Sequence, residues 1–388
     1  MMDRCIALSI LAIGTWQSVS AANVYRVTDL GTFLGSNLIA TDINDLGYVA
    51  GYAGTHAVVY KNGIVEDLGT LGGRSSRANG INNTGQIVGY ADTAQGDQRA
   101  FLYDAMGMHE LGTLGGDSSL AYAINDQGMI VGSSQTPAGD VRAVRYTESG
   151  PVDLGTLGGT YSQARAVNSQ GQVTGQSDNE SEERHAFLYS GGVMQDLGTL
   201  GGISSFGYGI NDAGEVVGQS TEARGQQRAF IYDGLQMREF TGLIPDAYGI
   251  AFDINNSGLA VGSSSGSASQ FTFSAVLFDP VSGTIDLNNQ IDPNSGWHLS
   301  EAAAINETGQ IIGRGFVESQ VRSFLLTPVP LPGALPLMVC GLVGLLGAAA
   351  RARFVSSVWW PWRIVTLRRQ PGVEADRHNA FTRRNCAA

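Results

Sequence analysis

Four copies of a glycine-rich heptapeptide are the first residues in this 388-residue chain whose pattern could support chemistry. DLGTLGG occurs at Asp67–Gly73, Asp153–Gly159 and Asp196–Gly202, and the near copy ELGTLGG occurs at Glu110–Gly116. A glycine-rich loop can cradle a phosphate with its backbone N–H groups, but such a loop needs a helix start and usually a lysine, as in GxxxxGK[ST]. Neither accompanies these copies. We therefore predict a turn at a strand end, where glycine permits a sharp bend.

Asparagine and glycine recur in a second phrase, which reads INDQGMIVG from Ile124 and INETGQIIG from Ile305. Its seven copies place asparagine at residues 44, 82, 125, 168, 211, 255 and 306. The phrase is similar to part of a calcium loop, but the spaced oxygen ligands and the closing glutamate of that loop are absent. Asparagine can hydrogen-bond its own backbone two residues on, and glycine can take a left-handed conformation. We predict a hairpin turn at each copy and no metal site, with Asp45, Asp126 and Asp212 as solvated turn residues.

The titratable side chains form no recognisable catalytic constellation. The five histidines are residues 56, 109, 185, 298 and 378. His56 and His185 stand where other repeats carry arginine, for example Arg99. A general base needs one tuned pKa, so a position at which histidine and arginine interchange is better interpreted as a polar strand start. The HExxH and CxxC motifs do not occur. We predict no catalytic residue, no metal ligand and no cofactor.

One segment interrupts the regular repeat. Asp286–Asn306 contains an insertion, and it presents Trp297 and His298 just before a predicted strand. Loops on a rigid scaffold often carry function, and an aromatic side chain there can stack on a sugar ring. Trp297 and His298 are therefore candidate ligand contacts. The alternative is that Trp297 packs over the final repeat, because large aromatic side chains are usually buried.

The spacing of the asparagines indicates which elements hold these residues. Successive asparagines are separated by 38, 43, 43, 43, 44 and 51 residues, a regular period that is typical of a repeat architecture. Within one unit, strands are predicted at Ala100–Tyr103 and Met108–Leu111, in addition to the two strands that flank the Asn–Gly turn. Each unit of about 43 residues therefore carries four short strands, as a propeller blade does.

The two ends of the repeat region predict how it closes. The final unit has strands only at Glu301–Ile305, Gln310–Gly313 and Arg322–Thr327, whereas an extra strand lies within Val24–Gly31, before the first full unit. Joining these ends completes a seventh four-stranded sheet and protects sheet edges that otherwise invite aggregation. We predict an all-β fold, a seven-bladed β-propeller over residues 22–328 that is closed by the N-terminal strand. An open β-solenoid with paired caps is the alternative.

Both ends of the chain carry targeting features. Residues 1–21 combine an arginine, an apolar run and terminal small residues, the pattern of a secretory signal peptide; a buried helix is the alternative. Residues 331–350 are uncharged and long enough to span a bilayer as a helix. The arginines that follow predict that the repeat region is outside and that the Arg- and Trp-rich tail, residues 354–388, is cytoplasmic. For residues 331–350 the alternative is a buried helix of a soluble domain.

Composition limits the partners of the repeat region. The net charge is −12 and Lys61 is the only lysine, so no nucleic-acid partner is expected, because phosphate binding needs clustered lysine and arginine. Cys5, Cys340 and Cys386 all lie outside residues 22–328. The repeat region therefore has no disulfide and must be held together by packing.

The recurring phrases resemble those of the HAF-repeat family of predicted extracellular bacterial proteins. HAF stands at His185–Phe187 and its variant RAF begins at Arg99 and Arg228, together with the DLGTLGG and INDxGxVVG phrases across Val24–Pro328. The resemblance implies a surface or secreted repeat protein without an assigned enzymatic activity.

Residues 329–353, which begin VPLPG, resemble a PEP-CTERM sorting signal in its VPLP form. This resemblance implies processing by an exosortase in bacteria that make exopolysaccharide. The chain departs from the pattern because residues 354–388 follow the arginines, so a membrane-anchored product is the alternative to release. We predict an exported, envelope-anchored or secreted, non-enzymatic binding or matrix component whose partner is exopolysaccharide or a surface protein. The alternative is a propeller enzyme acting on exopolysaccharide, with acids and histidine or tyrosine around its central channel.

Overall fold

The computed structural model describes residues 24–265 and 273–329. The predicted signal peptide, the predicted transmembrane helix and the tail lie outside the described residues. Within the described part of the chain, no helix is long and apolar enough to cross a membrane. Its regular structure consists of strands and one short 3-10 helix, η1 (Leu287–Gln290). The prediction of an all-β fold is therefore confirmed for these residues.

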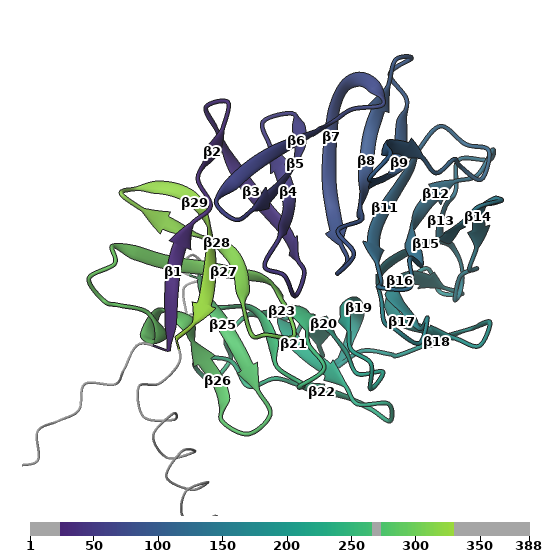
Figure 1. Ribbon diagram of the computed structural model, residues 1–388. Coiled ribbons are helices and arrows are strands. Elements are labelled where there is room, and N and C mark those ends of the chain that lie inside the picture. The colour runs from purple at the N-terminus through teal and green to yellow at the C-terminus, as the bar shows by residue number, and fades with distance from the viewer. Residues whose placement is uncertain (1–23, 266–272, 330–388) are drawn as a thin grey trace, which may run out of the picture. The chain divides into compact units, whose positions relative to one another are not determined.

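Seven antiparallel sheets are arranged around a central axis (Figure 1). Blade 1 contains β2 (Thr32–Phe33), β3 (Ser36–Ile43), β4 (Val49–Ala53), β5 (His56–Lys61) and β6 (Ile64–Gly69). Blade 2 contains β7 (Gly72–Ile81), β8 (Ile87–Thr93), β9 (Gln98–Asp104) and β10 (Gly107–Glu110). Blades 3 and 4 contain β11 (Ser119–Ile124), β12 (Ile130–Gln135), β13 (Val141–Thr147) and β14 (Gly150–Asp153), then β15 (Gly158–Val167), β16 (Val173–Asn179), β17 (Arg184–Ser190) and β18 (Val193–Asp196). The first full strand of each blade lines the channel.

The remaining blades follow the same order. Blades 5 and 6 contain β19 (Gly201–Ile210), β20 (Val216–Glu222), β21 (Gln227–Tyr232) and β22 (Met237–Glu239), then β23 (Gly249–Ile254), β24 (Ala260–Ser265), β25 (Phe273–Asp279) and β26 (Gly283–Asp286). Blade 7 contains β27 (Trp297–Ile305), β28 (Ile311–Val317), β29 (Gln320–Pro328) and, from the other end of the chain, β1 (Tyr25–Asp29). The prediction of seven four-stranded blades is confirmed, with the two-residue β2 as an addition to blade 1.

The ring closes where the two ends of the repeat region meet. β1 pairs antiparallel with β29, from Tyr25 opposite Pro328 to Asp29 opposite Phe324. Beyond this ladder, the N–H of Val329 donates a hydrogen bond to the carbonyl of Val24 at 2.8 Å. The predicted closure by the N-terminal strand is confirmed, and the alternative of an open solenoid is excluded.

The DLGTLGG copies connect the outer strand of one blade to the inner strand of the next. In the first copy, Asp67 accepts the N–H of Gly69 at 2.9 Å, and Gly69 has a φ of +78°, which glycine adopts without strain. Ser76 of β7 then donates to the carbonyl of Gly69 and accepts the N–H of Ala57 in the preceding blade. The heptapeptide is thus a connector held by Asp67 and by Ser76 of the strand that follows it, and the predicted turn is confirmed.

The hydrophobic core lies between neighbouring blades, because each blade is covered on both faces. In β17, Ala186 and Phe187 are adjacent, face opposite sides of the sheet and are both fully buried. Ala186 packs in a cluster with Phe230 of the following blade, whereas Phe187 packs in a cluster with Ala143 of the preceding one. The Ala–Phe pair of the HAF phrase therefore lets a large ring of one blade fill the space beside a small residue of its neighbour.

Candidate functional site

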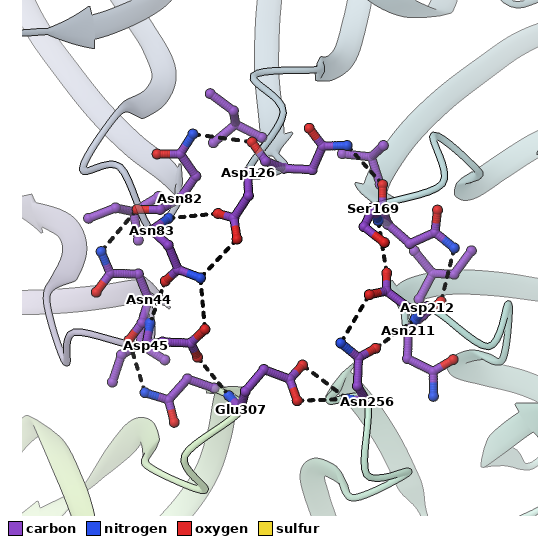
Figure 2. A pocket seen from close by; sticks show the side chains of 18 of the residues that line it. Asn44, Asp45, Asn82, Asn83, Asp126, Ser169, Asn211, Asp212, Asn256 and Glu307 are labelled. Carbon is purple, nitrogen blue, oxygen red and sulfur yellow. Dashed lines mark hydrogen bonds between the residues drawn. The ribbon is translucent and has the colours of Figure 1, made fainter.

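Seven asparagines, one from each blade, form a closed ring of hydrogen bonds at one end of the central channel (Figure 2). The Nδ2 of Asn168 donates to the carbonyl of Asn211 in the next blade at 3.0 Å, and the Nδ2 of Asn306 closes the ring on the carbonyl of Asn44 at 2.9 Å. The other five bonds join residues 44 to 82, 82 to 125, 125 to 168, 211 to 255 and 255 to 306. We call these residues the asparagine ring.

Each ring asparagine also builds its own turn. The Oδ1 of Asn168 accepts the N–H groups of Gln170 and Gln172, two and four residues on. The glycine of the same turn, Gly171, has a φ of +74°, as expected for a left-handed position. The predicted turn is confirmed, and one carboxamide holds both the turn within its blade and the contact with the next blade.

The acidic residues that follow the asparagines also join blades. Asp126 accepts the backbone N–H of Asn83 at 2.8 Å and its side-chain Nδ2 at 2.9 Å, and the N–H of Glu307 donates to Asp45 at 2.9 Å across the closure of the ring (Figure 2). Asp212 accepts the N–H of a residue in the preceding blade in the same way. Describing Asp45, Asp126 and Asp212 only as solvated turn residues was therefore incomplete, because their carboxylates bridge neighbouring blades.

Every inner strand bulges three residues before its ring asparagine. In β11, pairing with β12 runs to Ala121 and resumes at Ala123, so Tyr122 is the extra residue of a β-bulge, which re-aims its side chain. The seven bulged residues, which we call the bulge row, are Thr41, Asn79, Tyr122, Arg165, Tyr208, Phe252 and Ala303. All seven line a channel cavity of about 450 Å³, a size that suits a small ligand.

Aromatic and polar side chains of the bulge row contact one another. The hydroxyl of Tyr122 accepts a hydrogen bond from the Nε2 of Gln163 at 2.7 Å, and the guanidinium of Arg165 lies 4.6 Å from the centre of the Tyr122 ring. The ring centres of Tyr208 and Phe252 are 5.8 Å apart. The channel therefore offers aromatic surfaces beside hydrogen-bonding groups, the combination typical of small-ligand sites.

The bulge row was missed by sequence reasoning, although the chain carries a signal for it. The residues before the ring asparagines read ATDIN, ANGIN, AYAIN, ARAVN, GYGIN, AFDIN and AAAIN. A small residue, an aliphatic residue and asparagine recur, whereas the second position is different in most copies. A variable position inside a repeating phrase indicates a side chain that does not serve the common packing.

Two carboxyl groups line a smaller channel cavity of about 220 Å³, together with the bulge row. Asp42 accepts the N–H groups of Ile43 and of Ile81 in the next blade, and Asp253 makes the equivalent bonds in blades 6 and 7. Loss of hydration raises the pKa of Asp42 to about 7, with a further contribution from the charge of Asp253. Loss of hydration likewise raises the pKa of Asp253 to about 6.

These raised pKa values predict that the protein loses stability as the pH rises from about 4 to 7. A carboxyl whose pKa is higher in the folded than in the unfolded state binds more protons when folded, so deprotonation favours unfolding. The contribution is fully present below the unfolded pKa of 3.8 and is lost as the pH passes about 6 and 7. The urea concentration at the unfolding midpoint should fall over this pH range, and it should fall less steeply in Asp42→Asn than in the wild-type protein. Glu318→Gln, which removes an exposed charge, should keep the original slope; an unchanged slope in Asp42→Asn would contradict this explanation.

The structure separates the two candidate residues Trp297 and His298. Trp297 is partly buried and packs edge-on against Phe324, with ring centres 6.0 Å apart, in the core beside blade 7. His298 is exposed, stacks on Phe316 and lines a second cavity of about 510 Å³. Phe252 lines both this cavity and the channel. His298 therefore lies next to the channel, whereas Trp297 has the packing contact proposed as its alternative.

The other described histidines lie away from the channel in the outer strands. His56 in β5 contacts Asp67 in β6 at 2.7 Å, and His185 in β17 contacts Asp196 in β18 at 2.8 Å. His109 in β10 contacts Asp104 in β9 at 3.2 Å. Among the residues that the structure describes, no group of three or more histidine, cysteine, aspartate or glutamate side chains could hold a metal ion.

No protein-family model matches the chain, and no curated protein matches it. Solved structures with some similarity include TolB from Acinetobacter baumannii (13% identity over 51% of this chain and 52% of that one, TM-score 0.39), so this chain spans about half of that TolB. A Xanthomonas campestris gluconolactonase is also similar, with 14% identity over 81% of this chain and 93% of that one and a TM-score of 0.38. The six-bladed Aleuria aurantia lectin has 11% identity over 66% of this chain and 95% of that one and a TM-score of 0.37. These likenesses carry no argument about function.

Proposed function

We propose that this chain is a non-enzymatic binding component of the bacterial envelope and that its ligand contacts the bulge row. The ligand class that fits best is the sugar units of an exopolysaccharide. Tyr208 and Phe252 offer aromatic faces for stacking on sugar rings. Asn79 and Thr41 already donate to backbone carbonyls, and their side-chain oxygens can accept hydrogen bonds from sugar hydroxyls. A surface protein that inserts one side chain into the channel is the alternative partner.

A single observation carries this proposal. The repeats keep the residues that pack blades together, but at the bulge row they differ, and a β-bulge aims those seven side chains into one cavity. Bulges commonly re-aim side chains next to binding sites. A purely structural repeat would need only small residues at this position, as Ala303 shows in blade 7.

The test is binding of the full chain, held in detergent micelles, to a glycan array and to exopolysaccharide. We expect binding that Tyr208→Ala weakens about tenfold, the effect of losing one aromatic stacking surface. Tyr103→Ala, which removes a tyrosine packed in the core outside the channel, should leave binding unchanged in the folded fraction. Weaker glycan binding in His298→Ala would show that the site extends into the second cavity. Absence of binding to any glycan, or equal loss in both tyrosine variants, would refute the proposal.

The cellular location is part of the same proposal. We propose that residues 1–21 direct export and that residues 331–350 hold the propeller at the outer side of a membrane, with an exosortase as the processing partner. The support is the charge pattern of the sequence, because arginines follow the uncharged stretch directly. Mass spectrometry of the mature protein shows which ends are retained; a chain that keeps residues 1–21 and fractionates with the cytoplasm would refute it.

An enzyme acting on exopolysaccharide is the second candidate, and one observation favours keeping it. Asp42 and Asp253, whose pKa values are raised towards neutrality, share the channel with Tyr122 and Arg165. Perturbed carboxyls in a cavity are a common feature of catalytic sites. Their bonds to backbone N–H groups of adjoining blades give them a structural role as well. Release of reducing ends from exopolysaccharide that is lost in Asp253→Asn would favour the enzyme.

A further inference from the structure

Arg165 is the one charged residue of the bulge row, and it lies in the channel without a counter-ion. Its guanidinium stacks on the Tyr122 ring, and its Nε is buried without a hydrogen-bond partner. Within residues 24–265 and 273–329 it makes no ion pair and no hydrogen bond. A guanidinium that is partly removed from water and left unpaired has donors available for an anion.

The other arginine in the same cavity is differently placed. Arg314 forms a bidentate pair with Glu301, with N–O distances of 2.7 and 2.9 Å to the two carboxylate oxygens, so its charge is already compensated. Asp42 and Asp253 line a cavity together with Arg165, but among the described residues neither carboxyl forms an ion pair with it. The positive charge of the cavity is therefore concentrated at Arg165.

The aromatic side chains around Arg165 favour an anionic group that is attached to a sugar ring. The Arg165 guanidinium lies over the Tyr122 ring and its Nε is buried, so the two terminal Nη groups are the donors left to meet a planar carboxylate in a two-point contact. Tyr208 and Phe252, in the next two blades, present aromatic surfaces in the same cavity. A pyranose whose ring stacks on these residues while its carboxylate meets Arg165 would use both features.

We propose that the channel recognises a carboxylate-bearing sugar, a uronic acid unit of an acidic exopolysaccharide, and that Arg165 binds its carboxylate. This inference rests on the proposed binding function and adds the substrate class and the residue that determines it. The net charge of −12 repels an anionic polymer elsewhere on the surface, so its binding would depend on this one site.

Calorimetric titration of the full chain in detergent micelles tests this directly. The probes are oligoglucuronate and the neutral cello-oligosaccharide of equal length, which share a backbone and differ in the carboxylate. We expect the acidic sugar to bind at least about tenfold more tightly, an advantage that added salt reduces. Arg165→Gln should abolish the advantage without changing affinity for the neutral sugar, and Arg165→Lys should keep part of it, because a point charge replaces the planar fork.

Matched controls separate this inference from the proposed function. Arg224→Gln removes an exposed arginine in a loop away from the channel and should leave the preference intact. Melting temperatures of both arginine variants identify any loss that comes from unfolding. Equal binding of acidic and neutral sugars, or a preference that survives in Arg165→Gln, refutes the inference while leaving the binding function standing. Tighter binding of sulfated or phosphorylated sugars refutes the choice of carboxylate, and binding of no sugar refutes both.

Discussion

Gly132→Ala is expected to destabilise the propeller by at least about 3 kcal/mol, more than a typical core substitution. Gly132 is the last glycine of the INDxGxVVG phrase, and it pairs with Ala121 beside the bulge. An added Cβ would lie 1.9 Å from the carbonyl oxygen of Leu120 and 2.9 Å from the Cα of Ala121. Both atoms belong to the backbone, so relief requires that the inner strand move away, together with Tyr122 and the channel wall.

A matched substitution shows that the effect comes from crowding and not from loss of glycine itself. Gly139 has a φ of +93° and open space where its Cβ would be, so Gly139→Ala should cost only about 1–2 kcal/mol of backbone strain. Urea unfolding of the two variants gives the comparison. At Gly51 the equivalent Cβ would lie 2.2 Å from a carbonyl oxygen, and a smaller loss is expected there. Equal losses of stability at Gly132 and Gly139 would contradict backbone crowding as the cause.

Asn168→Asp should lower stability by about 3 kcal/mol at neutral pH, although the side chain hardly changes shape. Both oxygens of aspartate accept hydrogen bonds, so the bonds from Nδ2 to the carbonyl of Asn211 and to Gln172 are lost, and an oxygen instead faces that carbonyl. Asn168 is only 4% exposed, so a carboxylate there is also poorly hydrated. Removal of one link weakens the contact between blades 4 and 5.

The pH dependence of this variant provides an internal check. A buried carboxyl that faces a carbonyl should have a raised pKa, and its protonated form can donate again. Stability lost in Asn168→Asp should therefore be partly regained as the pH falls towards 5. Asn62→Asp, the same change in an exposed outer turn, should cost little and show no such recovery. A pH-independent loss in Asn168→Asp would contradict the hydrogen-bonded ring.

The fold could be predicted from the sequence because its determinants are local and repeated. The Asn–Gly turn fixes where one hairpin reverses, the Ala–Phe pair marks the third strand, and the surplus strand at Tyr25–Asp29 supplies what blade 7 lacks. Each of these features is written in consecutive residues. Strand boundaries were less accurate: β27 was predicted to begin at Glu301 but begins at Trp297, because the inserted segment extends the strand into its loop.

The site was harder to predict because it depends on contacts between blades. Nothing near Asn168 in sequence indicates that its carboxamide reaches Asn211, and the choice of channel residues depends on a bulge that shifts the alternation of side chains by one. The irregular insertion drew attention to Trp297, yet irregularity in sequence marked a packing position there. The informative irregularity was a single varying residue in each otherwise regular phrase.

The pairing of β1 with β29 also constrains how the molecule is made. β1 is the N-terminal strand of the propeller, and its ladder partner is the last strand, β29. During synthesis it therefore has no ladder partner until the chain has reached residue 328. Pairing across so long a stretch of chain is slow, because the intervening segment must first be brought together. A product truncated within blade 7 would leave an orphaned N-terminal strand and an open circle, the state most exposed to proteases and self-association.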